Sequence, residues 1–160
     1  MILLALDQSS KVTGYAIFDN QSLIKNGKIN LTHENVGIRL VQLREEVSNL
    51  IKTYKIEKVA FEDIQLQSTV GNNVKTYKIL AEVFGVIHEL CEEFNIPYEI
   101  VPSVTWKSAL NIKGKTRPEQ KANAADYVNI TYNIKPTQDE CDAICIGTHV
   151  LLKSSELNWD

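Results

Sequence analysis

The sequence predicts an α/β fold in which a five-stranded mixed sheet carries helices on both faces. Three strand-like segments follow one another at the start of the chain, a pattern typical of an antiparallel meander. Helical and strand-like segments then alternate, and such crossovers add parallel strands to a sheet. The 160 residues contain no linker, repeat or low-complexity segment, so we expect a single domain over residues 1–160, with a frayed tail over 154–160.

The expected strands are short and rich in apolar residues. The segment ILLALD is almost entirely apolar and ends in a carboxylate, which is typical of a central strand buried on both faces. The segment IEKVAFE has a similar character and also ends in a carboxylate. Pro102 marks the end of the last strand, because proline has no N–H to donate to a neighbouring strand. The five strands are expected at residues 2–7, 12–19, 22–31, 56–62 and 98–101.

Apolar residues recur at intervals of three and four in the segments that we expect to be helical. Over residues 35–54 they form one stripe, which predicts an amphipathic helix. Over residues 73–94 the apolar residues occupy two sides of the helix, so both sides should be covered by other parts of the protein or by a partner. Its second side is either buried within the chain or forms a dimer interface, and both interpretations stay open. Further helices are expected at residues 105–110, 118–128 and 138–153.

The composition is that of a soluble globular protein, with 44% hydrophobic and 23% charged residues. The longest strictly apolar run, Ile2–Leu6, is far shorter than the roughly 18 residues that a membrane-spanning helix needs. The start of the chain also lacks the basic region and cleavage site of a secretory signal. Three cysteines do not suggest a disulfide framework and suit a reducing compartment. We therefore expect a cytoplasmic protein without a membrane partner.

Positive charge is concentrated in one segment of an acidic chain. The formal net charge is −3, from 17 basic and 20 acidic residues. The segment 107–121 nevertheless contains five basic residues and one acidic residue. Such a segment is either a solvated face or a surface for a polyanion. Its basic residues are Lys107, Lys113, Lys115, Arg117 and Lys121.

Four acidic residues are expected to converge. Asp7 and Glu62 end two strands that we predict to be adjacent and parallel, so they should meet at one edge of the sheet. Asp139 and Asp142 are three residues apart, which places them on one face of the last helix. Each acid alone has an ordinary structural explanation, in turn chemistry, an ion pair with a lysine or helix capping. Together they would repel one another unless protons or metal ions compensated their charge.

Carboxylate oxygens without histidine favour Mg²⁺ or Mn²⁺ over zinc. Two such ions about 4 Å apart can bind the attacking and leaving oxygens of a phosphodiester in line. The sequence therefore predicts metal-assisted hydrolysis of a phosphodiester, and the basic segment would bind its polyanionic substrate.

Four segments resemble, in order, the successive motifs of the RuvC family of Holliday junction resolvases. They are ILLALDQSSKVTGYAIF, VAFEDI, VTWKSALNIKGKTRPEQK and DECDAICIGTH, and they span residues 2–150. The resemblance implies a ribonuclease H-like fold, a homodimer, and nicking of two opposed strands of a four-way DNA junction with a divalent metal. The short chain would fit a phage-encoded member. The family's catalytic acids fall on Asp7, Glu62, Asp139 and Asp142, and its functionally important lysines fall on Lys107 and Lys121.

One position departs from the family pattern. An aromatic residue often follows the strand-end glutamate by a few positions, whereas this chain has Gln65. The departure leaves junction distortion and sequence preference open, and it admits a broader nuclease for branched DNA. We expect Gln65 to contact DNA together with the five basic residues. Of these, Lys113, Lys115 and Arg117 should lie farther from the scissile phosphate than Lys107 and Lys121.

Two other classes of function stay open. A phosphotransferase of the actin or sugar-kinase type also begins with a strand, an aspartate and a turn, but no later glycine-rich nucleotide loop is found, and 160 residues do not suffice for its two domains. A non-catalytic module that binds junctions would keep the basic segment without needing four acids.

Several residues have a simpler interpretation in packing. Cys141, Cys145 and His149 are spaced four apart, but three ligands on one straight helix do not close a tetrahedral metal site, so we expect them to pack in the core. Trp106 is expected to anchor the core rather than to stack on DNA. Gly14 either allows a close approach to the active site or relieves a tight turn, and the sequence favours neither.

Overall fold

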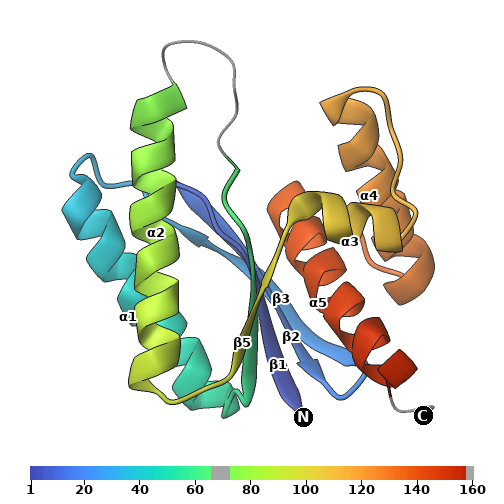
Figure 1. Cartoon of the computed structure of the whole chain (residues 1–160), viewed down its shortest axis with the longest axis horizontal. Coiled ribbons are helices and arrows are strands. Elements are labelled where there is room, and N and C mark those ends of the chain that lie inside the picture. The colour runs from blue at the N-terminus through green and yellow to red at the C-terminus, as the bar shows by residue number, and fades with distance from the viewer. Residues whose placement is uncertain (66–72, 158–160) are drawn as a thin grey trace.

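A computed structural model describes residues 1–65 and 73–157, and a five-stranded mixed sheet lies between two layers of helices (Figure 1). The strand order is β3-β2-β1-β4-β5. The first three strands form an antiparallel meander, and β4 and β5 run parallel to β1. The predicted fold class is thus confirmed. The strands are β1 Ile2–Asp7, β2 Val12–Asp19, β3 Ser22–Asn30, β4 Lys58–Glu62 and β5 Tyr98–Val101.

Helices cover both faces of the sheet, as the sequence predicts (Figure 1). The helices α1 (Val36–Tyr54) and α2 (Asn73–Glu93) pack on one face. The other face carries α3 (Ser103–Ala109), α4 (Arg117–Tyr132) and α5 (Gln138–Glu156).

Three helix boundaries differ from the predicted ones by more than one residue. The helix α3 begins earlier than residue 105, and α4 continues beyond residue 128. The helix α5 extends into the segment expected to be a frayed tail, where the Ser154 hydroxyl donates to the Val150 carbonyl at 3.0 Å. Within the described ranges, no helix is long and apolar enough to cross a membrane.

The alternation of side chains along β1 separates two hydrophobic cores. Leu4 and Leu6 pack toward α1 and α2, whereas Leu3 and Ala5 pack toward α5. Asp7 continues the second series, so its carboxylate emerges on the face that α5 covers. The same alternation in β4 places Glu62 on that face, because Ala60 also belongs to the α5 core.

Two glycines allow α5 to lie close to the sheet. A Cβ atom on Gly14 would lie 2.0 Å from the carbonyl oxygen of Asp139, and a Cβ atom on Gly147 would lie 2.3 Å from the Phe18 ring. Both separations are too short for non-bonded atoms, so a side chain at either position would push the helix outward. For Gly14 the structure therefore supports the close approach and not the tight turn, because its neighbour is the first turn of α5.

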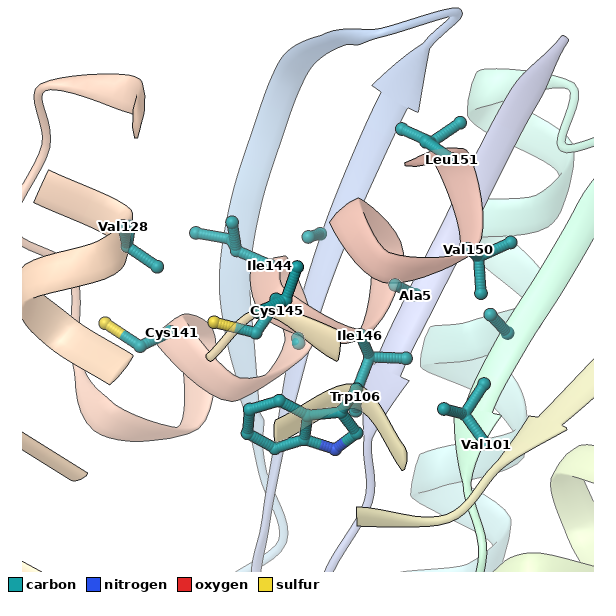
Figure 2. Close-up of a cluster of buried hydrophobic side chains, with 14 of the residues drawn as sticks. Ala5, Val101, Trp106, Val128, Cys141, Ile144, Cys145, Ile146, Val150 and Leu151 are labelled. Carbon is teal, nitrogen blue, oxygen red and sulfur yellow. The ribbon is translucent and has the colours of Figure 1, made fainter. Parts of the chain in front are cut away.

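The core between the sheet and α5 contains three of the residues for which packing was predicted, Cys141, Cys145 and Trp106 (Figure 2). Cys141, Cys145 and Trp106 are each at most 1% exposed, and His149 is 8% exposed. Burial raises the pKa of both thiols, which makes them poor metal ligands near neutral pH. Packing is confirmed for all four residues.

Candidate active site

The four predicted acids line one cavity at the carboxyl ends of β1 and β4. The cavity has a volume of about 460 Å³. Asp7 is the last residue of β1, Glu62 is the last residue of β4, and Asp139 and Asp142 lie in the first two turns of α5. Parallel pairing of β1 with β4 brings the two strand ends together, and α5 crosses above them. The predicted convergence is confirmed.

Hydrogen bonds at the start of α5 fix the orientation of its first turn. The Glu140 carboxylate accepts from the Thr137 backbone N–H at 2.8 Å and from the Thr137 hydroxyl at 2.7 Å. The same carboxylate accepts from the Asn26 side chain at 3.1 Å, which ties the helix to β3. These bonds satisfy groups that a helix start otherwise leaves unpaired. Asp139 and Asp142, three residues apart on this turn, therefore reach the same cavity.

The acids carry more negative charge than the site neutralises. Burial raises the pKa of Asp7 well above its usual value, and the negative charges of Glu62, Asp142 and Asp139 raise it further. Burial also raises the pKa of Glu62, although the Trp106 indole N–H opposes this effect. Burial raises the pKa of Asp142 to about 6, against the opposing charges of Lys107 and Lys121. A bound cation or proton would relieve this repulsion.

The donor set suits a hard divalent ion. Five carboxylates line the cavity, the four predicted ones and Asp63, and among the described residues neither histidine nor cysteine lines it. Across residues 1–65 and 73–157, however, no three His, Cys, Asp or Glu side chains already form a group that could hold a metal ion. An ion would therefore have to draw the carboxylates closer together. The excess of negative charge described above attracts a cation, and a bound cation would offset the repulsion that keeps the carboxylates apart.

Basic side chains face the acids from two helices. Lys107 of α3 and Lys121 of α4 line the cavity, as predicted. A glutamine side chain accepts a hydrogen bond from each lysine. Lys107 Nζ donates to Gln120 Oε1 at 3.2 Å, and Lys121 Nζ donates to Gln138 Oε1 at 3.0 Å. Among the described ion pairs, neither lysine has an acidic partner. Both charges can therefore act on an anionic substrate.

Arg117 lies beside the acids and not with Lys113 and Lys115. It lines the same acidic cavity as Lys107 and Lys121. Its charge also lowers the pKa of both Glu62 and Asp142, against the larger effect of burial. Arg117 is the first residue of α4, and Lys121, one turn later on the same helix, lines the same cavity.

A second cavity of about 560 Å³ adjoins the first. The two share Gln65, Ser103, Lys107 and Gln120, so together they form one continuous groove. Lys113 lines the second cavity, which agrees with its expected position farther out. Lys115 is exposed and lines neither cavity.

Sequence reasoning did not identify the amides and the indole that support the charged groups. The Gln8 side chain donates to the Glu62 carbonyl and accepts from the Glu62 N–H, the latter at 3.2 Å. The Trp106 indole N–H donates to Glu62 Oε2 at 3.1 Å. The position of Gln8, directly after a strand-end acid, was the one available signal. Gln120 and Gln138 carry no such signal.

The strand order, the mixed sheet and the four acids on β1, β4 and α5 define an α/β protein of the ribonuclease H-like class with an acidic site. Residues 3–149 match the family model described as crossover junction endodeoxyribonuclease RuvC. The chain therefore belongs to the RuvC family, whose members are endodeoxyribonucleases that depend on divalent metal.

Individual relatives agree with this assignment. A crossover junction endodeoxyribonuclease RuvC of Helicobacter pylori (strain ATCC 700392 / 26695) is 34% identical over 156 residues, covering 93% of this chain and 96% of the relative. The protein of the same description from Aliarcobacter butzleri (strain RM4018) is 31% identical, covering 93% of this chain and 97% of the relative.

Two solved structures share the fold. The RuvC of Thermus thermophilus, in complex with a Holliday junction substrate, superposes with a TM-score of 0.78 at 15% identity, covering 97% of this chain and 96% of that chain. The fowlpox virus resolvase, in complex with Holliday junction DNA, gives a TM-score of 0.65 at 16% identity, covering 96% and 99%. The family resemblance and the ribonuclease H-like fold inferred from the sequence are both confirmed.

Proposed function

We propose that this chain is a metal-dependent endonuclease that resolves four-way DNA junctions by hydrolysing one phosphodiester on each of two opposed strands. The observation that carries the proposal is the convergence of the four predicted carboxylates, with Asp63 beside them, in one cavity that is bordered by three basic side chains. Family membership supports the reaction, and the names of the relatives support the substrate. Action on DNA agrees with the cytoplasmic location expected from the sequence.

In this proposal Asp7, Glu62, Asp139 and Asp142 hold two Mg²⁺ ions, for which Mn²⁺ can substitute. Bound ions would supply a nucleophilic water at neutral pH and would neutralise charge at the scissile phosphate. The protein's own contribution is to bring carboxylates from three separate elements into one half-buried site. Burial strengthens their attraction for a cation, because the surrounding dielectric is low.

Lys107, Lys121 and Arg117 act on the other side of the scissile phosphate. Fixed positive charges stabilise the negative charge that grows on the phosphate oxygens in the transition state. The amides of Gln120 and Gln138 hold the two lysines in place before DNA arrives. The adjoining cavity would receive the neighbouring part of the strand, with Lys113 binding a phosphate there and Gln65 at the boundary of the two cavities.

The test is cleavage of a synthetic four-way junction by variants of the acids. Asp7→Asn, Glu62→Gln and Asp142→Asn should each remove most cleavage in Mg²⁺, whereas the exposed Glu45→Gln on α1 should leave it intact. Junction binding, measured by gel shift in EDTA, should be nearly unchanged in all four variants. Parallel loss of binding and cleavage would show that the acids are structural. Binding without cleavage by the wild-type chain would instead support a non-catalytic junction-binding module.

We also propose that the chain acts as a homodimer, because a two-fold pair supplies one site to each of two opposed strands. The exposed side of helix α2 is our candidate for the dimer interface. Its Val83 and Ile87 are buried in the core of the chain, so one apolar side is explained within the monomer. On the opposite side Val74 is 60% exposed, and Gly85 is exposed: among the described residues, no atom other than its own neighbouring helix backbone lies within 4 Å of where its Cβ would be. A glycine in a helix interior costs about 1 kcal/mol relative to alanine, and a closely packed second helix would explain it.

A charge on this face tests the dimer. Gly85→Arg should give a folded monomer that nicks single strands but does not make paired incisions. The control is Glu45→Arg on the exposed face of α1, which should stay dimeric. Sedimentation measures the assembly and circular dichroism measures the fold. Val83→Glu is unsuitable, because it would bury a charge in the core. A Gly85→Arg protein that remains dimeric would place the interface elsewhere.

A further inference from the structure

Glu62 is held at two points, which sets it apart from a carboxylate on a flexible surface. The Gln8 amide forms a reciprocal pair of hydrogen bonds with the Glu62 backbone, and this pair extends the link between β1 and β4 beyond their last paired residues. The Trp106 indole N–H binds the carboxylate itself, at Oε2. Among the described residues no other group donates to this carboxylate. Its orientation is therefore set by one donor.

That donor is rigid. Trp106 is 1% exposed and belongs to the core between the sheet and α5, where Figure 2 shows it among labelled residues such as Cys145 and Ile146. Core side chains are close-packed and rarely leave their rotamers, so the direction of the indole N–H is fixed by packing. A buried indole N–H also needs an acceptor, and Glu62 is the acceptor that it has.

We propose that Trp106 is a positioning residue for the acidic site: its indole N–H occupies Oε2 of Glu62 and so presents Oε1 to a divalent ion. The inference rests on the proposed role of Glu62 as a metal ligand. Partners that hydrogen-bond a ligating carboxylate typically contribute 10- to 100-fold to metal affinity or activity, because they fix its orientation before the ion binds. Trp106 thus links the hydrophobic core to the reaction, beyond its packing role.

The cleanest perturbation replaces the indole N–H alone. Benzothienylalanine has the shape of tryptophan with sulfur in place of the N–H, and it can be incorporated in a Trp159→Phe background, where Trp106 is the one remaining tryptophan. Calorimetric titration with Mn²⁺ should show affinity reduced about 10- to 100-fold. The Mg²⁺ concentration for half-maximal cleavage should rise by a similar factor. Junction affinity in EDTA and the urea midpoint should stay unchanged.

Trp106→Phe offers the same test by ordinary mutagenesis, with Val128→Ala as the control for lost core volume. Val128 is fully buried in the same core and is not among the residues that line the acidic cavity. In a Glu62→Gln background, removal of the indole N–H should cause no further loss of Mn²⁺ affinity. Unchanged Mn²⁺ affinity in the analogue protein, or equal losses in Val128→Ala and Trp106→Phe, would refute the positioning role and leave the proposed nuclease intact. Absence of cleavage by the wild-type chain, with Mn²⁺ binding still dependent on the indole, would refute the nuclease alone.

Discussion

Asp142→Asn should stabilise the protein in EDTA while it removes cleavage. Burial raises the pKa of Asp142 to about 6, from a usual value of 3.8. The folded chain therefore holds this carboxylate in its charged form only at a cost in free energy. Asparagine has nearly the same shape and carries no charge, so the variant avoids that cost. A residue that the proposed reaction needs should thus lower the stability of the metal-free fold.

The size and the pH range of the effect follow from the two pKa values. Below pH 3.8 the carboxyl is protonated in both the folded and the unfolded chain, so it contributes nothing. Between pH 3.8 and 6 the folded chain keeps a proton that the unfolded chain has lost, so rising pH favours unfolding. Above pH 6 the cost in free energy is constant. It amounts to about 3 kcal/mol, because each unit of difference between the two pKa values corresponds to about 1.4 kcal/mol. Because the neighbouring acids titrate together with Asp142, we expect a gain of about 1–3 kcal/mol in the variant at pH 7.5.

Urea unfolding followed by circular dichroism measures this difference at pH 4 and pH 7.5 in EDTA. The wild-type chain should lose more stability between the two pH values than Asp142→Asn. In melting temperature the gain at pH 7.5 corresponds to roughly 3–10 °C for a chain of this size. Excess Mg²⁺ should stabilise the wild type and have much less effect on the variant, because ligands stabilise the state that binds them. The exposed Asp126→Asn on α4 serves as the control. A variant that is no more stable than the wild type in EDTA at pH 7.5 would refute the reasoning.

The acidic site could be predicted from the sequence because local periodicity determines where its members lie. A strand that alternates apolar residues between two cores and then ends in an acid fixes the face of that acid, as Asp7 and Glu62 show. A spacing of three on a helix likewise places Asp139 and Asp142 together. The parallel pairing of β1 with β4 then follows from the general rule that strands joined by a helical crossover run parallel in a sheet.

The supporting contacts could not be predicted, because they join residues far apart in the chain. The bond from Trp106 to Glu62 depends on how α3 packs on α5, and the bond from Lys121 to Gln138 depends on how α4 meets α5. His88 is similar, since no partner could be named for it from the sequence, yet its Nε2 lies 2.6 Å from the Tyr98 hydroxyl on β5. Such contacts follow from tertiary packing, which single-sequence patterns do not encode.

Two further predictions separate roles within the site. Lys107→Ala and Lys121→Ala should each lower the cleavage rate at saturating DNA. Lys113→Ala should instead weaken DNA binding, and the slope of the log binding constant against log salt concentration should fall by about one unit. Equal effects of all three variants on affinity alone would show that Lys107 and Lys121 only anchor phosphates. Gly14→Ala should disturb the position of α5, because its Cβ would lie 2.0 Å from the Asp139 carbonyl oxygen and the helix backbone must move to admit it. Overpacking of this kind costs about 1–3 kcal/mol, which urea unfolding measures. Cleavage should fall further than that loss explains, since Asp139 and Asp142 move with the helix while Asp7 and Glu62 stay on the sheet. A Gly14→Ala protein with wild-type stability and wild-type cleavage would show that the close approach of α5 is not needed to bring the four carboxylates together.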